Sequence, residues 1–183
     1  MRRRPNPPST AAIRAAAWHD VITARDLIAL GVPESTVYDR CRDGGPWQRL
    51  LPGIVMLSTG HPTDEQILVA ALLQAGPDAM LTGLEACHRH GVRRGPHRRG
   101  ALQLLIPHSQ QRRNNTLVIV ERSRRLPCPV VRGGFPLAPV ARAVIDAARR
   151  LRSEREIAEL VSDAVQQRRC TVEELAAELR ACA

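Results

Sequence analysis

The order of helix and turn signals in the first sixty residues constrains the fold more than any other feature of this sequence. Capping residues such as Ser9 and Thr23 stand before short apolar runs, and Gly31 stands where a left-handed residue can end a helix. Three short helices are therefore expected, over approximately residues 9–20, 23–31 and 33–42.

A hairpin is expected after the third helix. The run Asp43-Gly44-Gly45-Pro46 breaks that helix, and two apolar segments then flank Pro52-Gly53. Helix, helix, short turn, helix and hairpin is the order of a winged helix-turn-helix, which binds DNA through its third helix. A generic small α/β unit containing a helical hairpin carries the same local signals, and it stays open as the alternative.

The rest of the chain predicts a second domain of mixed character. Thr63 and Thr82 each begin an apparent capping box, with Gln66 and Glu85 at the third helical positions. Strands are expected over 101–106, 116–121 and 129–132, and helices from Pro139 onward. The sequence thus predicts an α+β fold, with a disordered basic arm at 1–8, a winged helix-turn-helix at 9–60 and an α/β domain at 61–183.

The charged residues exclude several enzyme classes and indicate an anionic partner. All 27 basic residues are arginine, so lysine-dependent phosphate loops, Schiff bases and lysine-containing nuclease sites are impossible. The net charge of +9 favours a polyanion such as nucleic acid. The excess lies in residues 86–125, where ten arginines face one acidic residue.

We predict a cytoplasmic protein with no catalytic residues, no cofactor and no membrane segment. The five cysteines are widely spaced without a CxxC pair, which favours free thiols, and the longest apolar run has seven residues. Cys87, His88 and His90 could suggest zinc, but no second pair stands at a suitable spacing, and no metal site is predicted.

The third predicted helix supplies most candidate DNA-binding residues. Val37 and Cys41 share an apolar face, so its polar residues turn outward. Asp39 is equally compatible with an ion pair to Arg42 and with a cytosine contact. The predicted DNA-binding set comprises helix residues Ser35, Thr36, Tyr38, Arg40 and Arg42, hairpin residue Arg49, and arm residues Arg2, Arg3 and Arg4.

A second group of arginines forms a predicted basic patch in the second domain. Its members come from the arginine-rich segment 93–99 and from the polar loop 108–115, which lies between two expected strands. They are Arg93, Arg94, Arg98, Arg99, Arg112 and Arg113. This patch is a candidate surface for DNA phosphates or for an acidic protein partner.

Four segments carry a resemblance to a known family. They read VITARDLIALGVPESTVYDRCRDGGPWQRLLPGIVML at 21–57, TDEQILVAALLQAGPDAMLTGLEACHRHGV at 63–92, LQLLIP at 102–107, and GGFPLAPVARAVIDAARRL at 133–151, with an ARxxxD core in the last. The chain resembles AbiEi-family antitoxins of type IV toxin-antitoxin systems. The motifs are patterns of Gly, Pro and apolar residues, so they bear on the fold more than on a site.

The resemblance implies a bacterial antitoxin and transcriptional autorepressor that binds double-stranded DNA in its own operon promoter. It also implies a nucleotidyltransferase-like toxin as the partner, neutralised directly or indirectly. The matched recognition helix is 34–42 and the matched hairpin is 47–57. An alternative function is a protein-interaction antitoxin module that binds its toxin through segment 86–125 with little DNA binding. A metal-dependent enzyme using Cys87, His88 and His90 is the third hypothesis.

Overall fold

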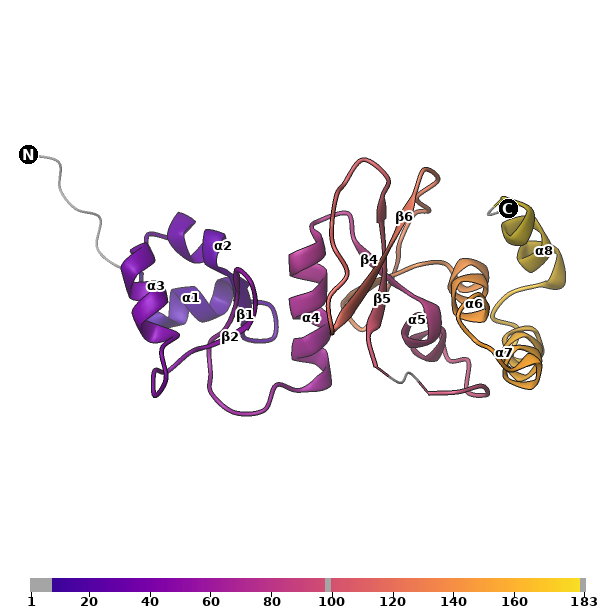
Figure 1. Ribbon diagram of the computed structural model, residues 1–183, viewed down its shortest axis with the longest axis horizontal. Coiled ribbons are helices and arrows are strands. Elements are labelled where there is room, and N and C mark those ends of the chain that lie inside the picture. The colour runs from indigo at the N-terminus through magenta and orange to yellow at the C-terminus, as the bar shows by residue number, and fades with distance from the viewer. Residues whose placement is uncertain (1–7, 98–99, 182–183) are drawn as a thin grey trace, which may run out of the picture. The chain divides into compact units, whose positions relative to one another are not determined.

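The computed structural model describes residues 8–97 and 100–181, and its α+β class agrees with the sequence prediction (Figure 1). The predicted arm at 1–8 falls almost wholly outside these residues. The chain divides into two compact units, Met1–Pro77 and Asp78–Ala183, called unit 1 and unit 2 below. Each has its own sheet.

The first part of unit 1 combines three short helices with a three-stranded antiparallel sheet. In chain order its elements are α1 (Thr10–Ala16), β1 (Val21–Thr23), α2 (Ala24–Ala29), α3 (Glu34–Arg40), β2 (Gln48–Leu51) and β3 (Ile54–Met56). The strand order is β1-β3-β2, so the hairpin strand β3 lies in the middle. The three helices and the hairpin were predicted, whereas strand β1 was not.

Local capping explains where two of these helices begin. The Ser9 hydroxyl accepts a hydrogen bond from the N–H of Ala12, and the Thr23 hydroxyl accepts one from that of Asp26. Helix α1 ends at Ala16, earlier than predicted, because residues 18 and 21 pair across a tight turn and lead the chain into β1.

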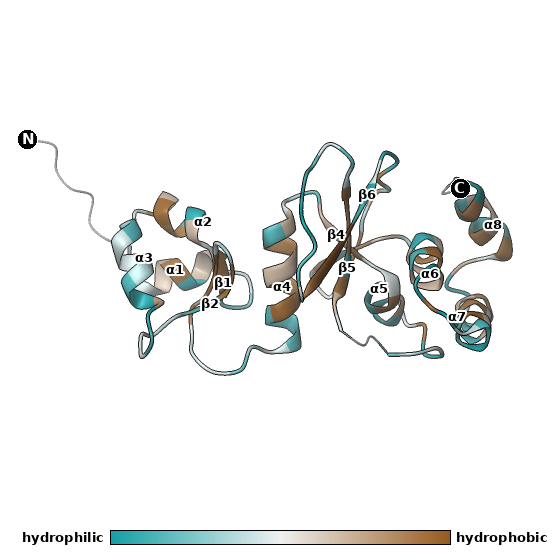
Figure 2. Cartoon of the chain, in the orientation of Figure 1, coloured by the Kyte–Doolittle hydropathy of each residue, from teal (hydrophilic) through white to brown (hydrophobic). Residues whose placement is uncertain are grey.

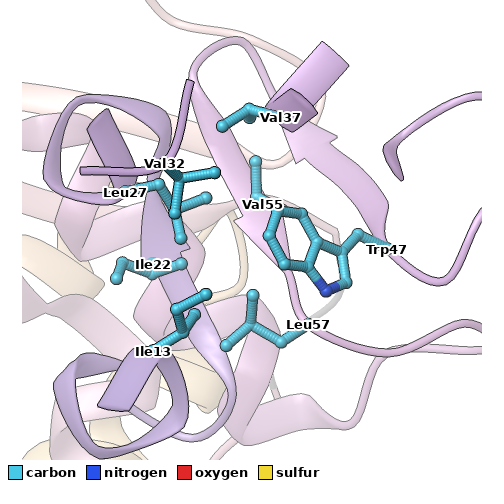
Figure 3. Close-up of a cluster of buried hydrophobic side chains, with 8 residues drawn as sticks. All are labelled: Ile13, Ile22, Leu27, Val32, Val37, Trp47, Val55 and Leu57. Carbon is cyan, nitrogen blue, oxygen red and sulfur yellow. The ribbon is translucent and has the colours of Figure 1, made fainter. Parts of the chain in front are cut away.

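The core of unit 1 is a compact apolar cluster drawn from α1, β1, α2, α3 and β3 and from residues that flank these elements (Figure 3). Figure 3 shows the Trp47 indole lying beside Val55, with Ile22 and Leu27 facing the same interior. The cluster comprises Ile13, Ile22, Leu27, Val32, Val37, Trp47, Val55 and Leu57. It fixes α3 against the hairpin, which decides the face of α3 that meets solvent.

Helix α4 (Asp64–Ala75) belongs to unit 1, although the sequence analysis placed residues 61–183 in the second domain. The capping box predicted for Thr63 and Gln66 is confirmed. The helix packs on β1, β2 and β3, and the Gln66 amide donates a hydrogen bond to the carbonyl of His19. Its packing on the sheet therefore moves the boundary to Pro77.

Unit 2 is a mixed sheet with helices packed on it. The strands are β4 (Met80–Thr82), β5 (Leu102–Pro107), β6 (Val118–Ser123), β7 (Val130–Arg132) and β8 (Phe135–Leu137), in the order β6-β5-β4-β8-β7. The helices are α5 (Gly83–Arg89), α6 (Val140–Ala148), α7 (Glu154–Gln166) and α8 (Val172–Ala181). Figure 2 shows β4 and β5 as mostly hydrophobic ribbon, in keeping with their burial.

Helix α6 is the central helix of unit 2. It contacts α5, α7 and α8, and its mid-section is buried (Figure 1). Strands β5, β6 and β7 were predicted, as were all four helices, whereas the three-residue strands β4 and β8 were not. No helix within the described parts of the chain is both long enough and apolar enough to span a bilayer.

Candidate nucleic-acid interface

The exposed face of α3 is set by what its other face buries. Val37 is buried and Cys41, just beyond the helix, packs against the same core. Ser35, Tyr38 and Arg42 consequently face solvent, while Thr36 is half-buried. The sequence analysis predicted the outward direction of Ser35 and Arg42, but it also turned Thr36 outward, and that residue is half-buried.

Tyr38 forms an aromatic platform for two arginines from different elements. It is 57% exposed, which is unusual for a large aromatic side chain. The Arg42 guanidinium lies 5.3 Å from the centre of its ring, and that of Arg49, in β2, lies 5.9 Å from the same centre. Both distances allow cation–π attraction, so the three side chains form one surface cluster that joins α3 to the hairpin.

Asp39 gives Arg42 a second partner. A carboxylate oxygen of Asp39 lies 3.2 Å from a guanidinium nitrogen of Arg42, one helical turn along. The ion pair that the sequence analysis weighed for Asp39 is therefore present. Because both side chains are largely exposed, the pair contributes little stability and mainly restricts where Arg42 points.

Arg40 is oriented differently from the rest of the predicted set. Its guanidinium lies 4.7 Å from the ring centre of Trp47, and the residue is only half-exposed. Trp47 itself is buried in the core. Arg40 therefore covers the edge of the unit 1 core, a role that the sequence analysis did not foresee.

A tight turn makes the Arg40–Trp47 contact possible. The N–H of Gly45 donates to the carbonyl of Arg42, and the N–H of Trp47 donates to that of Arg40. A Cβ atom on Gly45 would lie 2.4 Å from the Arg40 carbonyl oxygen. Only glycine fits at this position. The Gly44-Gly45-Pro46 turn thereby brings Trp47 back beside Arg40 at the end of α3.

The hydroxyl groups of Ser35 and Thr36 do not cap the first turn of α3. Pro33 occupies the N-cap position, and in this fully described helix no side chain makes the capping hydrogen bond. Ser35 is exposed and Thr36 half-buried. The predicted arm residues Arg2, Arg3 and Arg4 lie outside the described residues.

The predicted basic patch comes from two separate loops. Arg93 and Arg94 precede β5, and their backbone N–H groups donate to Asp163 of α7 at 2.6 and 3.1 Å. Arg112 and Arg113 are exposed in the loop that returns the chain from β5 to its parallel neighbour β6. Arg98 and Arg99 lie outside the described residues.

Asp163 anchors the first of these loops and is 2% exposed. Burial has the largest single effect and raises the pKa of its carboxyl, but the N–H groups of Arg93 and Arg94, the Gln167 side chain and the charge of Arg94 together outweigh it. The net result is a pKa below the usual value. The main chain of the loop is thereby fixed, while both arginine side chains are exposed.

Unit 2 also contains a buried ion pair that the search for site residues missed. Arg142 donates from Nε to both carboxylate oxygens of Asp146, at 2.8 and 2.9 Å. The Thr82 hydroxyl donates to Asp146 at 2.6 Å. These residues are the arginine and aspartate of the ARxxxD segment, whose spacing of four places both on one helical face. The capping role predicted for the Thr82 hydroxyl is wrong, because that hydroxyl is bound to Asp146 instead.

Gly83 adjoins this buried pair and has a left-handed backbone, with φ of +66°. A Cβ atom there would lie 1.7 Å from the amide oxygen of Gln103. The same amide group lies 3.5 Å from the backbone carbonyl of Asp146. The close packing of α5, β5 and α6 at this point indicates a structural role for the ion pair.

The cysteine and histidine cluster is spread over different environments. Burial raises the pKa of the Cys87 thiol, which disfavours the thiolate that a metal would need. The rings of His88 and His97 lie 4.9 Å apart, whereas His90 contacts the carbonyl of Ala138. Over the described ranges, no three or more Cys, His, Asp or Glu side chains are grouped as a metal site.

Comparison with known proteins gives a likeness in fold. No protein-family model and no curated protein matches the chain. Among solved structures, it is similar to the crystal structure of the RV2827C protein from Mycobacterium tuberculosis, with a TM-score of 0.57 and 17% sequence identity. The match covers 87% of this chain and 66% of that one, so this chain spans somewhat less than two thirds of that protein. At this identity the likeness concerns the fold alone.

Proposed function

We propose that residues 9–60 are a winged helix-turn-helix that binds double-stranded DNA, and that the protein is an antitoxin and transcriptional autorepressor. The observation that carries the DNA-binding part is the cluster of Tyr38, Arg42 and Arg49, which joins the exposed face of α3 to the hairpin. The arrangement of three helices with a sheet in the order β1-β3-β2 supports it.

In this proposal α3 enters the major groove and the β2–β3 hairpin lies along the sugar-phosphate backbone. Arg42 is the base-reading residue, since its pairing with Asp39 restricts its direction. Arg49 contacts a phosphate from the hairpin. Contact with the Tyr38 ring limits the conformational freedom that the two guanidinium groups lose on binding.

The charge balance implies that arginines outside the recognition elements must contribute to the attraction for DNA. Over residues 5–60 five arginines are matched by five acidic residues, so this region has no net attraction for DNA. We propose that the arginines of the N-terminal arm and of segment 86–125 supply much of the phosphate attraction, while α3 and the hairpin set the register.

The antitoxin part of the proposal rests on the resemblance of the four sequence segments to AbiEi-family antitoxins. The partner is then a nucleotidyltransferase-like toxin encoded in the same operon. Co-expression tests this part: the protein should restore growth of cells that produce the toxin. Continued growth arrest at full antitoxin expression would contradict it.

A gel-shift assay on the fragment upstream of the gene tests DNA binding. The wild-type protein should shift this fragment at lower concentration than a random fragment of equal length. Arg42→Ala/Arg49→Ala should abolish the preference, whereas Arg155→Ala, which changes an 87% exposed side chain of α7, should keep it. Equal shifts of both fragments by the wild type would contradict sequence-specific binding.

Segment 86–125 supports a second candidate function, direct binding of the toxin with little DNA binding. The favouring observation is that Asp163 fixes the main chain at Arg93 and Arg94 while both side chains are exposed. Arg93→Glu/Arg94→Glu should abolish toxin neutralisation and leave the DNA shift intact if this candidate is correct. Loss of DNA binding without loss of neutralisation would exclude it.

A further inference from the structure

The mixed sheet of unit 2 ends in two edge strands, β6 and β7. The backbone groups of an edge strand can pair with a strand of another chain, and proteins usually cover or charge such edges. The β6 edge is covered. The Asn115 side chain accepts from the N–H of Val118 at 2.9 Å, and the Asn114 side chain accepts from that of Val120 at 2.8 Å. The loop before β6 thus occupies the positions that a further strand would use.

The β7 edge is open. All residues from Cys128 to Gly134 are exposed, and Val131 in the middle of β7 is 68% exposed, although valine is usually buried. Over the described ranges, no hydrogen bond from outside the sheet reaches Val131. The two edges of this sheet therefore differ, and β7 is the one that another chain can extend.

A proline in β8 fixes which backbone groups of β7 face outward. The two strands are antiparallel, and their opposite pairs are Val131 with Pro136 and, on either side, Val130 with Leu137 and Arg132 with Phe135. Such pairs alternate between exchanging two hydrogen bonds and exchanging none. Because proline has no N–H, the Val131–Pro136 pair exchanges none. The N–H and C=O of Val131 consequently point away from β8, toward the open edge.

The two faces of β7 specify the residues of an added strand. Val130 and Arg132 lie on one face, where both line an open cavity of about 580 Å³ that α8 also lines, and Val131 lies on the other face. In an antiparallel addition, the residues opposite Val131 and Val130 should be apolar and the residue opposite Arg132 acidic. From its N-terminus, the added segment therefore reads acidic, apolar, apolar.

The charges beside β7 favour an acidic partner. Arg132 and Arg169 line the cavity and have no acidic partner among the described residues, whereas Arg125 is paired with Glu178. Glu174 accepts from an N–H at the start of its own helix, α8. A second copy of this chain would bring the same arginines and a net charge of +9, so the two copies would repel each other.

We propose that β7 is a docking strand for an extended acidic segment of a partner protein, which adds to the sheet antiparallel to β7 by hydrogen bonds to the Val131 backbone. This is recognition by strand addition. Pro129 before β7 has no N–H, and the Gly133-Gly134 turn follows β7 directly, so the contact is short and binding is reversible. The proposal uses only residues of unit 2 and does not depend on DNA binding.

Hydrogen exchange of the free full-length protein, followed by nuclear magnetic resonance, tests the open edge. The amide of Val131 should exchange rapidly, whereas the amides of Val130 and Arg132 should be protected by their bonds to β8. Protection of all three amides would show that the edge is already covered and would overturn the proposal.

Titration of the ¹⁵N-labelled protein with the synthetic peptide acetyl-Thr-Thr-Glu-Val-Val-Thr-Thr-amide tests docking. The Val131 amide resonance should shift and its exchange should slow. A peptide with Lys in place of Glu should bind at least about fivefold more weakly, and a peptide N-methylated at its first valine should give no protection. Equal affinity of the Glu and Lys peptides would overturn the acidic partner, and an unchanged Val131 amide at saturating peptide would overturn docking at β7.

Val131→Pro locates the contact, because it removes the outward N–H and no bond to β8. Edge strands tolerate proline at such positions, so the thermal unfolding temperature should change little. Binding of the Glu peptide should weaken by at least about fivefold, as expected for one lost hydrogen bond. Val131→Thr keeps the N–H and is the matched control. Wild-type affinity in Val131→Pro would overturn the proposal.

Two further measurements separate this proposal from its alternatives. Arg132→Glu should reverse the preference between the Glu and Lys peptides, whereas Arg42→Ala should leave peptide binding unchanged, so this proposal and DNA binding can fail independently. Sedimentation equilibrium without peptide should give the same mass for the wild type and Val131→Pro. A wild-type dimer that Val131→Pro converts to a monomer would overturn the acidic partner and assign the edge to a second copy.

Discussion

Arginine serves opposite purposes in the two units. In unit 1, Arg42 and Arg49 lie over the exposed ring of Tyr38 at the surface. In unit 2, Arg142 is buried and bound by Asp146, which is itself completely buried and also accepts from Thr82. The first pair of arginines can exchange its contacts for those of a partner, whereas Arg142 cannot leave its carboxylate without leaving a buried charge unpaired.

This difference shows why the number of arginines alone does not locate a binding surface. A guanidinium over an exposed ring retains most of its water and loses little when it binds a new anion. A buried guanidinium fixes the relation between its helix and the neighbouring elements. The predictions below test this division, beginning with the largest expected effect.

Asp146→Asn should cause the largest loss of stability. It leaves Arg142 buried without its principal countercharge, and removing one partner of a buried pair costs about 3–5 kcal/mol. Urea denaturation of the full-length protein measures the free energy of unfolding. Glu159→Gln, which removes the partner of the exposed Arg155, is the control and should cost far less, because water screens this pair. Equal losses in the two variants would refute the contrast.

Asp163→Asn should have the next largest effect. The carboxylate accepts from the N–H groups of Arg93 and Arg94, and losing its charge should cost about 1–3 kcal/mol. Because the folded-state pKa of Asp163 is lowered, its contribution is fully present above the unfolded-state pKa and is lost as pH falls through the folded-state pKa. Urea denaturation between neutral and acidic pH measures this loss, which should be smaller in Asp163→Asn than in the wild type.

Arg40→Ala should cost about 1 kcal/mol of unit 1 stability, because its guanidinium covers the ring of Trp47. Arg42→Ala is the matched control in the same part of the chain and should change stability by no more than about 0.5 kcal/mol. Thermal unfolding followed through tryptophan fluorescence separates them. A greater loss for Arg42→Ala than for Arg40→Ala would reverse the roles assigned to the two residues.

Local signals predicted a large share of the fold because they act over a few residues. The Thr63–Gln66 capping box and the threonine caps at the starts of α2 and α8 are hydrogen bonds between residues three apart. Strands β1, β4 and β8 were missed because their pairing depends on segments that are distant in the sequence.

The candidate site was predicted less completely for a similar reason. The outward face of α3 follows from Val37, but the joining of Arg49 to Tyr38 depends on how the hairpin packs on the helix. Thr82 was assigned a capping role from its spacing to Glu85, whereas its hydroxyl binds Asp146, 64 residues away. Contacts over such separations carry no local sequence signal.

The salt dependence of DNA binding tests the central claim most directly. The affinity for the upstream fragment should fall steeply with salt in the wild type, and Arg49→Ala should make the slope of log K against log salt concentration smaller by about 1, as expected for one lost phosphate contact. Arg155→Ala should keep the wild-type slope. A wild-type slope in Arg49→Ala, or an affinity for DNA that does not change with salt, would contradict the proposal that α3 and the hairpin bind DNA.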